Sequence, residues 1–134
     1  MKVTKKTRLL AAVPIAQSED GTVKVFSVKD NGQATVFTYG HNWLLTGEGL
    51  KANGGDTGWS VAMAQLKIAP DADPAEMGHV CAADGRSLTV SGAGSIPPAA
   101  GAYENARIVL QLQKRDSMID PEYLEIPLAK LIVE

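Results

Sequence analysis

The sequence contains one cysteine, Cys81, and few aromatic residues, which make up 5% of the chain. A single thiol excludes an intrachain disulfide framework and any zinc or iron–sulfur site that needs several cysteines. Chains of this kind suit a reducing compartment, so we expect a cytoplasmic location.

Long apolar runs and a strong excess of one charge are also missing. No stretch approaches the roughly 20 consecutive apolar residues that a membrane-spanning helix needs. The formal net charge of -2 gives no electrostatic footprint for nucleic acid. We therefore expect a soluble chain whose partner is another protein or a second copy of itself, with a small molecule as the alternative.

Catalytic and metal-binding motifs are absent as well. The chain has no Gly-x-Ser-x-Gly, His-Glu-x-x-His or Rossmann pattern. His79 and Cys81 share one side of an expected strand, but two ligands alone do not make a metal site. The acidic segment with Asp71, Asp73 and Glu76 lacks the pattern of a calcium loop, so we interpret it as a solvated loop. We predict no metal and no cofactor, and the sequence favours a protein that is not an enzyme.

Turn-forming residues are abundant. The 13 glycines and 7 prolines fit many turns between short strands better than long helices. The strongest turn signal is the Asn31-Gly32 pair, which separates the strand-forming runs 22–29 and 34–39. Asn-Gly tolerates the positive φ angles of a two-residue type I′ turn, so these runs predict a β-hairpin. We expect its second strand to continue to Leu45.

Two further Asp-Gly pairs, at 20–21 and 84–85, predict turns of the same kind. The first pair follows an expected first strand over residues 9–17. The second pair joins expected strands over 79–83 and 86–93. Successive turns between short strands predict a meander of antiparallel hairpins.

The apolar phase changes within residues 22–29, from Val23 and Val25 to Phe26 and Val28. A strand with a period of two accommodates such a change only by a β-bulge or by burial of both faces. Either solution predicts a strand that lies between two others.

Residues 59–69 are apolar on both faces, with Val61 and Met63 on one face and Leu66 on the other. This pattern predicts a buried central strand. A helix over residues 60–67 is the alternative, because several of these residues are good helix formers.

Residues 106–114 show the cleanest alternation in the chain and predict a half-exposed strand. The core side of this strand is expected to consist of Ile108, Leu110 and Leu112. A last strand is expected over residues 123–133. Pro127 cannot donate to a β-ladder, so we expect it to face an open edge or a bulge.

Together these patterns predict a single all-β domain over residues 1–134, an antiparallel β-sandwich or β-barrel of about eight strands with little or no helix. We expect residues 1–8 to form a basic arm or the start of the first strand. The basic residues precede an apolar run over 9–16, which also has the outline of a secretory signal. That alternative would make the protein a secreted one.

His41 is the first candidate for a binding residue. Tyr39 and Trp43 lie close to it in the sequence, and an imidazole beside an aromatic wall can hold or deprotonate a ligand. Trp59 completes the expected ligand-binding set. The alternative is a strand-end histidine beside a packed tryptophan, because no acid–base partner lies at motif spacing.

The two longest expected loops, 47–58 and 94–105, provide the second candidate surface. Its contact residues are expected to be Leu50, Asn53, Asp56, Ile96 and Tyr103. We predict a non-enzymatic binding or assembly module that presents these loops on a β scaffold. The alternatives are a small-ligand pocket protein or small enzyme in a β-barrel, and a homo-oligomeric structural subunit of a virion or other assembly.

Overall fold

The computed structural model describes residues 13–52, 59–114 and 120–134. All regular secondary structure in these ranges is β, in 12 strands that form three sheets. This confirms the predicted all-β class with mainly antiparallel pairing, although the strands are shorter and more numerous than the about eight expected. None of the described residues forms a helix that is long and apolar enough to cross a membrane.

The largest sheet has five strands in the order β2-β3-β5-β9-β8. They are β2 (Ala16–Gln17), β3 (Lys24–Asp30), β5 (Trp43–Glu48), β9 (Ser87–Val90) and β8 (His79–Cys81). The hairpins β2–β3 and β8–β9 lie where the two Asp-Gly pairs predict them. Of the first strand expected over residues 9–17, the structure describes residues 13–17, and the last two of these form β2 and pair with β3. Residues 1–12, which include the basic arm, lie outside the described part.

The second sheet has four strands in the order β12-β11-β6-β7. They are β12 (Glu122–Pro127), β11 (Arg107–Lys114), β6 (Trp59–Lys67) and β7 (Ala75–Met77). β6 pairs with both β11 and β7, so residues 60–67 form the predicted central strand and not a helix. The register of β6 with β11 shifts beside Leu112, where Ala62 has no partner. Val61 therefore lies on the same buried side as Leu66, and the prediction that these two residues lie on opposite faces is wrong.

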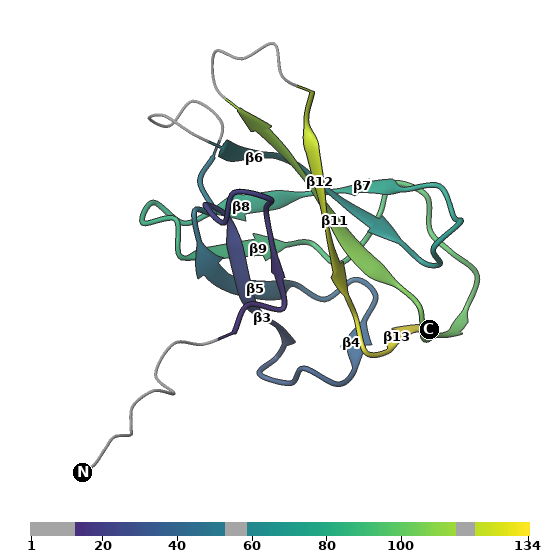
Figure 1. The fold of residues 1–134 in the computed structure, drawn as a ribbon. Coiled ribbons are helices and arrows are strands. Elements are labelled where there is room, and N and C mark those ends of the chain that lie inside the picture. Colours follow the sequence, from purple (N-terminus) through teal and green to yellow (C-terminus); the bar gives the residue numbers. More distant parts are fainter. Residues whose placement is uncertain (1–12, 53–58, 115–119) are drawn as a thin grey trace.

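A small third sheet closes one end of the molecule, at the bottom of Figure 1. Its order is β10-β13-β4, with β10 (Gly101–Tyr103), β13 (Leu131–Val133) and β4 (Phe37–Thr38). The pairing of β13 with β4 is parallel. The last strand expected over residues 123–133 is therefore divided between two sheets, and the expected loop over 94–105 contains β10. Pro127 ends β12, which is an edge strand as predicted.

The Asn31-Gly32 turn forms as predicted, with φ angles of 54° and 84°. The residues on either side of it exchange two backbone hydrogen bonds. The expected hairpin partner is wrong, however, because β3 pairs with β5 and not with residues 34–39. Phe37 is fully buried, and its burial draws the chain from the turn into the third sheet. The chain turns again between β4 and β5, which interrupts the single strand expected to reach Leu45.

The described hydrophobic core is one cluster, built from residues of all three sheets. Three side chains of β11 have no exposed surface, as predicted: Ile108, Leu110 and Leu112. The predicted β-bulge in β3 is present as well, because its register with β5 shifts between Val25 and Ser27. Val25 and Val28 are both buried as a result, although they are three residues apart.

Candidate functional site

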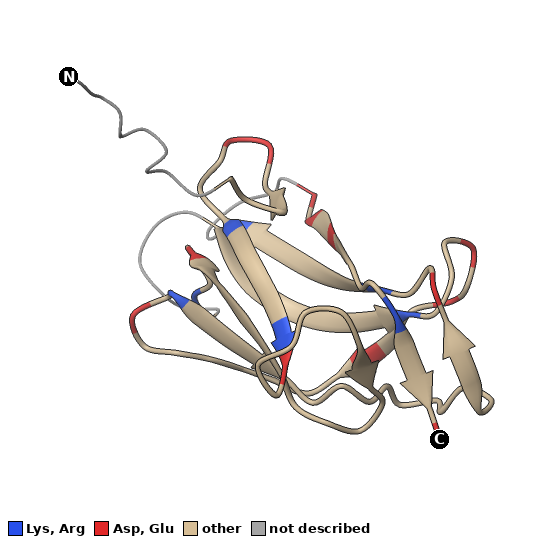
Figure 2. Ribbon diagram, turned by 90° about the horizontal axis from the view of Figure 1, so that it is seen from below, with Lys and Arg blue, Asp and Glu red and all other residues tan. Residues whose placement is uncertain are grey.

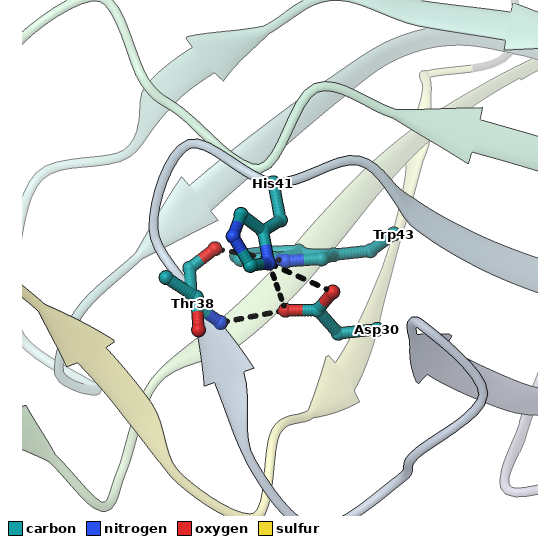
Figure 3. A network of polar contacts seen from close by, with 4 residues as sticks. All are labelled: Asp30, Thr38, His41 and Trp43. Carbon is teal, nitrogen blue, oxygen red and sulfur yellow. Dashed lines mark hydrogen bonds and ion pairs between the residues drawn. The ribbon is translucent and has the colours of Figure 1, made fainter.

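A polar cluster lies at the end of β3, beside the Asn31-Gly32 turn (Figure 3). Asp30 is buried, with an exposed fraction of 6%. One of its carboxylate oxygens accepts a hydrogen bond from the Thr38 N–H at 2.7 Å. His41 Nδ1 lies 3.1 and 3.2 Å from the two carboxylate oxygens. The carboxylate therefore holds both the backbone of β4 and the imidazole.

Strand pairing produces this cluster. The register of β3 with β5 aligns Asp30 with Trp43, and the tight loop before β5 returns His41 to the carboxylate. The Trp43 indole N–H donates to the Thr38 carbonyl at 3.2 Å, so side chains bind both backbone polar groups of Thr38. Sequence reasoning misses Asp30 as a site residue because only this non-local register brings it to His41.

The predicted ligand-binding residues are placed mainly by internal contacts. Trp43 is fully buried and packs edge-to-face against Phe37, with ring centroids 5.6 Å apart. The Tyr39 hydroxyl accepts a hydrogen bond from the Gly94 N–H and donates one to the Gly94 carbonyl. His41 is more exposed, with 57% of its side chain accessible. Tyr39, His41 and Trp43 thus converge near β4, but the polar atoms of Tyr39 and Trp43 are engaged inside the protein.

Trp59 belongs to a different cluster. Its indole N–H donates to Asp20, in the loop between β2 and β3, at 2.9 Å. The same carboxylate accepts hydrogen bonds from the N–H and hydroxyl of Thr22 and from the hydroxyl of Ser18. The hydrogen bonds from Thr22, supported by those from Trp59 and Ser18, hold the pKa of Asp20 well below its usual range. This cluster fastens the β2–β3 loop to β6.

The Asp30–His41 pair resembles the acid and base of a catalytic triad. In such a triad a carboxylate bonded to Nδ1 orients the imidazole so that Nε2 can accept a proton. Two polar hollows of about 460 and 160 Å³ lie beside it. Their linings contain no serine or cysteine for the imidazole to activate, and their one hydroxyl side chain is that of Thr38, whose backbone Asp30 and Trp43 hold. The contacts of the pair therefore support a structural role, in which Asp30 locks β4 to the end of β3.

This structural role predicts a large difference between two variants. Asp30→Ala should lower the free energy of unfolding by about 1–3 kcal/mol, because the Thr38 N–H then loses its acceptor. His41→Ala should cost less than about 0.5 kcal/mol, because its side chain is largely exposed. Urea denaturation of both variants measures the difference. If His41→Ala lowers the free energy of unfolding as much as Asp30→Ala does, the imidazole is the main partner of the carboxylate.

His79 and Cys81 occupy alternate positions of β8 and are both half-buried. Burial raises the pKa of the Cys81 thiol, which lowers the population of the reactive thiolate. No group of three or more His, Cys, Asp or Glu side chains in the described ranges can hold a metal ion. His79 and Cys81 therefore have no third ligand among the described residues with which to form a metal site.

In the described part, basic and acidic residues do not form separate surface patches. Figure 2 shows Lys and Arg interspersed with Asp and Glu along the ribbon. Asp71, Asp73 and Glu76 are exposed, as predicted. The predicted loop is wrong at Glu76, however, because this residue lies in β7 and pairs with β6. This distribution gives no support to a nucleic-acid interface on the described residues.

The described part of the first predicted contact loop, residues 47–52, is built into the fold. Leu50 is wrong as a contact residue, because its side chain is fully buried and its N–H donates to the Gly85 carbonyl at 2.8 Å. β5 extends to Glu48, so the loop expected over residues 47–58 begins later than predicted. Glycine content predicts a free loop here, but Gly47 allows close packing against β3, and Gly49 allows it against the two residues that precede β3.

The other predicted loop residues differ in their surroundings. Ile96 is 75% exposed and borders a hollow of about 270 Å³. Tyr103 is half-buried, and its hydroxyl donates to the Ala99 carbonyl. Asn53 and Asp56 lie outside the described residues. Ile96 is therefore the one large apolar side chain among these five residues that is exposed in the described part.

An apolar pocket that the sequence reasoning misses lies between β3 and the segment that follows β12. Its volume is about 370 Å³, which is within the range of small-ligand sites. The residues that line it are Ile15, Phe26, Ser27, Val28, Ala34, Pro127, Leu128 and Ala129. All of them except Ser27 are apolar. We call this hollow the seam pocket. Four separate segments of the chain supply its lining, so no local sequence pattern points to it.

Backbone groups of β3 also face the seam pocket. β2 pairs only with the first two residues of β3, and at the other end Asp30 exchanges two backbone hydrogen bonds with Gln33. The N–H and C=O of alternate residues in a strand point to the same side. Val28 therefore directs its N–H and C=O to the side where Asp30 meets Gln33, which is the side of the pocket.

Two candidate sites result: the Asp30–His41 cluster, whose polar contacts hold β4, and the seam pocket, whose apolar lining is open to solvent. Comparison of the chain with models of known protein families, with curated protein sequences and with solved structures found no match.

Proposed function

We propose that the chain is a non-enzymatic binding or assembly module that holds apolar side chains of a protein partner in the seam pocket. The observation that carries this proposal is the open apolar lining of the pocket. Burial of a leucine-sized side chain against such walls contributes roughly 1.5–3 kcal/mol. The contact surface in this proposal is the seam between strands and not the glycine-rich loop.

Exposed apolar residues continue from the pocket onto the surrounding surface. Ile15 is 47% exposed and Val13, two residues earlier, is 84% exposed. Pro127 and Ala129, which also line the pocket, are exposed as well. An apolar rim around an apolar hollow is typical of a surface that a partner covers. A protein partner would bury the rim together with the pocket.

The enzyme alternative at His41 has less support. The polar contacts of Asp30 are accounted for by the backbone of β4 and the imidazole, and the adjoining hollows offer no serine or cysteine. A small apolar molecule is the second candidate occupant of the seam pocket, because the volume of about 370 Å³ suits one.

A solvatochromic dye tests the proposed function. Nile red is uncharged, and its emission rises and shifts to the blue in apolar surroundings, so it should bind the dilute full chain. Ala34→Phe should remove most of this emission, because the added ring fills the pocket from an exposed position on its wall. Ala83→Phe adds the same ring at an exposed alanine outside the pocket and should leave the emission unchanged.

His41→Ala separates the binding proposal from the enzyme alternative. Dye emission of this variant should equal that of the unchanged chain, because His41 does not line the seam pocket. Loss of emission in His41→Ala, together with full emission in Ala34→Phe, would contradict the proposal. That result would move the site to the polar hollows beside Asp30.

A further inference from the structure

We infer that the partner is a second copy of the chain, which inserts the side chains of Leu9 and Leu10 into the seam pocket. This inference rests on the proposed function of the pocket. The residues immediately before Val13 are Leu9, Leu10, Ala11 and Ala12, an apolar run that matches the apolar lining. The inference therefore names the occupant by its chemistry and by its position in the sequence.

The described chain begins at the rim of the pocket. Ile15 lines the pocket, and its N–H donates to the Val25 carbonyl at 2.8 Å, which ties this point of the chain to β3. Val13 is 84% exposed, so its side chain makes little contact with the described part of the protein. Leu10 lies five residues before Ile15, and five extended residues span at most about 17 Å. That reach is enough to cross from one copy to another at a shared rim.

A second copy accounts for the rim and the pocket together. Leucines that folded back into their own pocket would fill the hollow but leave the rim of Val13, Ile15 and Pro127 exposed. In a pair related by a two-fold axis, each N-terminal segment crosses to the other copy while the two rims cover one another. A two-fold interface uses the same patch on both copies, and exchange of an identical element is a low-cost route to a dimer.

The backbone of β3 adds a second attraction. Val28 directs its N–H and C=O to the pocket side of β3, beyond the part of the strand that β2 covers. A segment that enters the pocket in extended form can bond to these groups, as peptides do at an open strand edge. Leucine side chains and one pair of backbone hydrogen bonds would then hold the inserted segment.

Sedimentation equilibrium of the full chain over a range of concentrations tests this inference. The chain should be a dimer when concentrated and a monomer when dilute. Leu10→Asp should weaken dimerisation by about tenfold or more, because it replaces a buried leucine by a charge. Ala34→Phe should weaken it similarly by filling the pocket. Leu44→Asp is the matched control, because Leu44 is 44% exposed and lies outside the pocket, and this variant should dimerise like the unchanged chain.

Dye binding separates failure of this inference from failure of the proposed function. A chain that stays monomeric at all concentrations, and binds Nile red in a manner that Ala34→Phe blocks, overturns the second-copy inference and leaves the proposed function in place. Dye emission that appears only in Leu10→Asp also overturns the inference, because the segment then fills the pocket of its own chain. If Ala34→Phe changes neither the dye emission nor the dimerisation, the proposed function is overturned as well.

Discussion

Leu110→Ala should lower the free energy of unfolding by about 2–5 kcal/mol, as large-to-small substitutions in a packed core do. Leu110 lies in the middle of β11 and has no exposed surface. β11 pairs with β12 on one side and with β6 on the other, so its backbone is held from both sides. The surrounding strands cannot move far enough to fill the cavity, and the loss should therefore lie well above that of a surface substitution.

Gln111→Ala is the matched control, one residue further along the same strand. Gln111 is half-buried on the other side of β11, and its amide makes a long hydrogen bond of 3.4 Å to the Tyr123 hydroxyl. Its truncation should change the free energy of unfolding by less than about 0.5 kcal/mol. Urea denaturation compares the two variants. Equal losses at both positions would show that the buried side of β11 is assigned wrongly.

Gly47→Ala should cost about 3 kcal/mol, although it adds only one methyl group. β5 approaches β3 so closely here that a Cβ at Gly47 would overlap the carbonyl oxygen of Lys24 and lie 3.1 Å from the Cα of Val25. The neighbouring atoms belong to the backbone, so no side chain can rotate away from the new methyl group. The two strands have to separate, which breaks their pairing beside the β-bulge.

Gly78→Ala provides the control for this substitution. Gly78 links β7 to β8, and a Cβ there would lie 3.8 Å from the Ser91 side chain, which is an ordinary van der Waals contact. The variant should remain within about 0.5 kcal/mol of the unchanged chain. Thermal unfolding, monitored by circular dichroism, measures the stability of both variants. A Gly47→Ala variant that melts with the unchanged chain would contradict the close approach of β3 and β5.

The turns and the cleanest strand could be predicted because their signals are local. The Asn31-Gly32 pair itself tolerates the positive φ angles that the turn requires, whatever the distant residues do. The change of apolar phase at Phe26 likewise predicts the β-bulge, because burial of Val25 and Val28 demands it. The alternation along β11 identifies its buried side in the same direct way.

Strand partners and sites could not be predicted because distant residues decide them. The runs on either side of the Asn31-Gly32 turn favour a hairpin, but burial of Phe37 against Trp43 takes the second run into another sheet. Leu50 closely follows Gly47 and Gly49, yet its side chain belongs to the hydrophobic core and has no exposed surface. The seam pocket combines four segments of the chain, and the Asp30–His41 pair exists only through the register of β3 with β5.

The seam pocket is tested most directly by an isotope-filtered nuclear Overhauser experiment on a mixture of two preparations of the full chain. One preparation carries isotope-labelled leucine methyl groups, and the other is unlabelled. Phe26 lines the pocket, so we predict nuclear Overhauser effects between the Leu10 methyl groups of one copy and the Phe26 ring protons of the other. Intermolecular effects that instead connect Leu44 with its own counterpart, with none at Phe26, would contradict it.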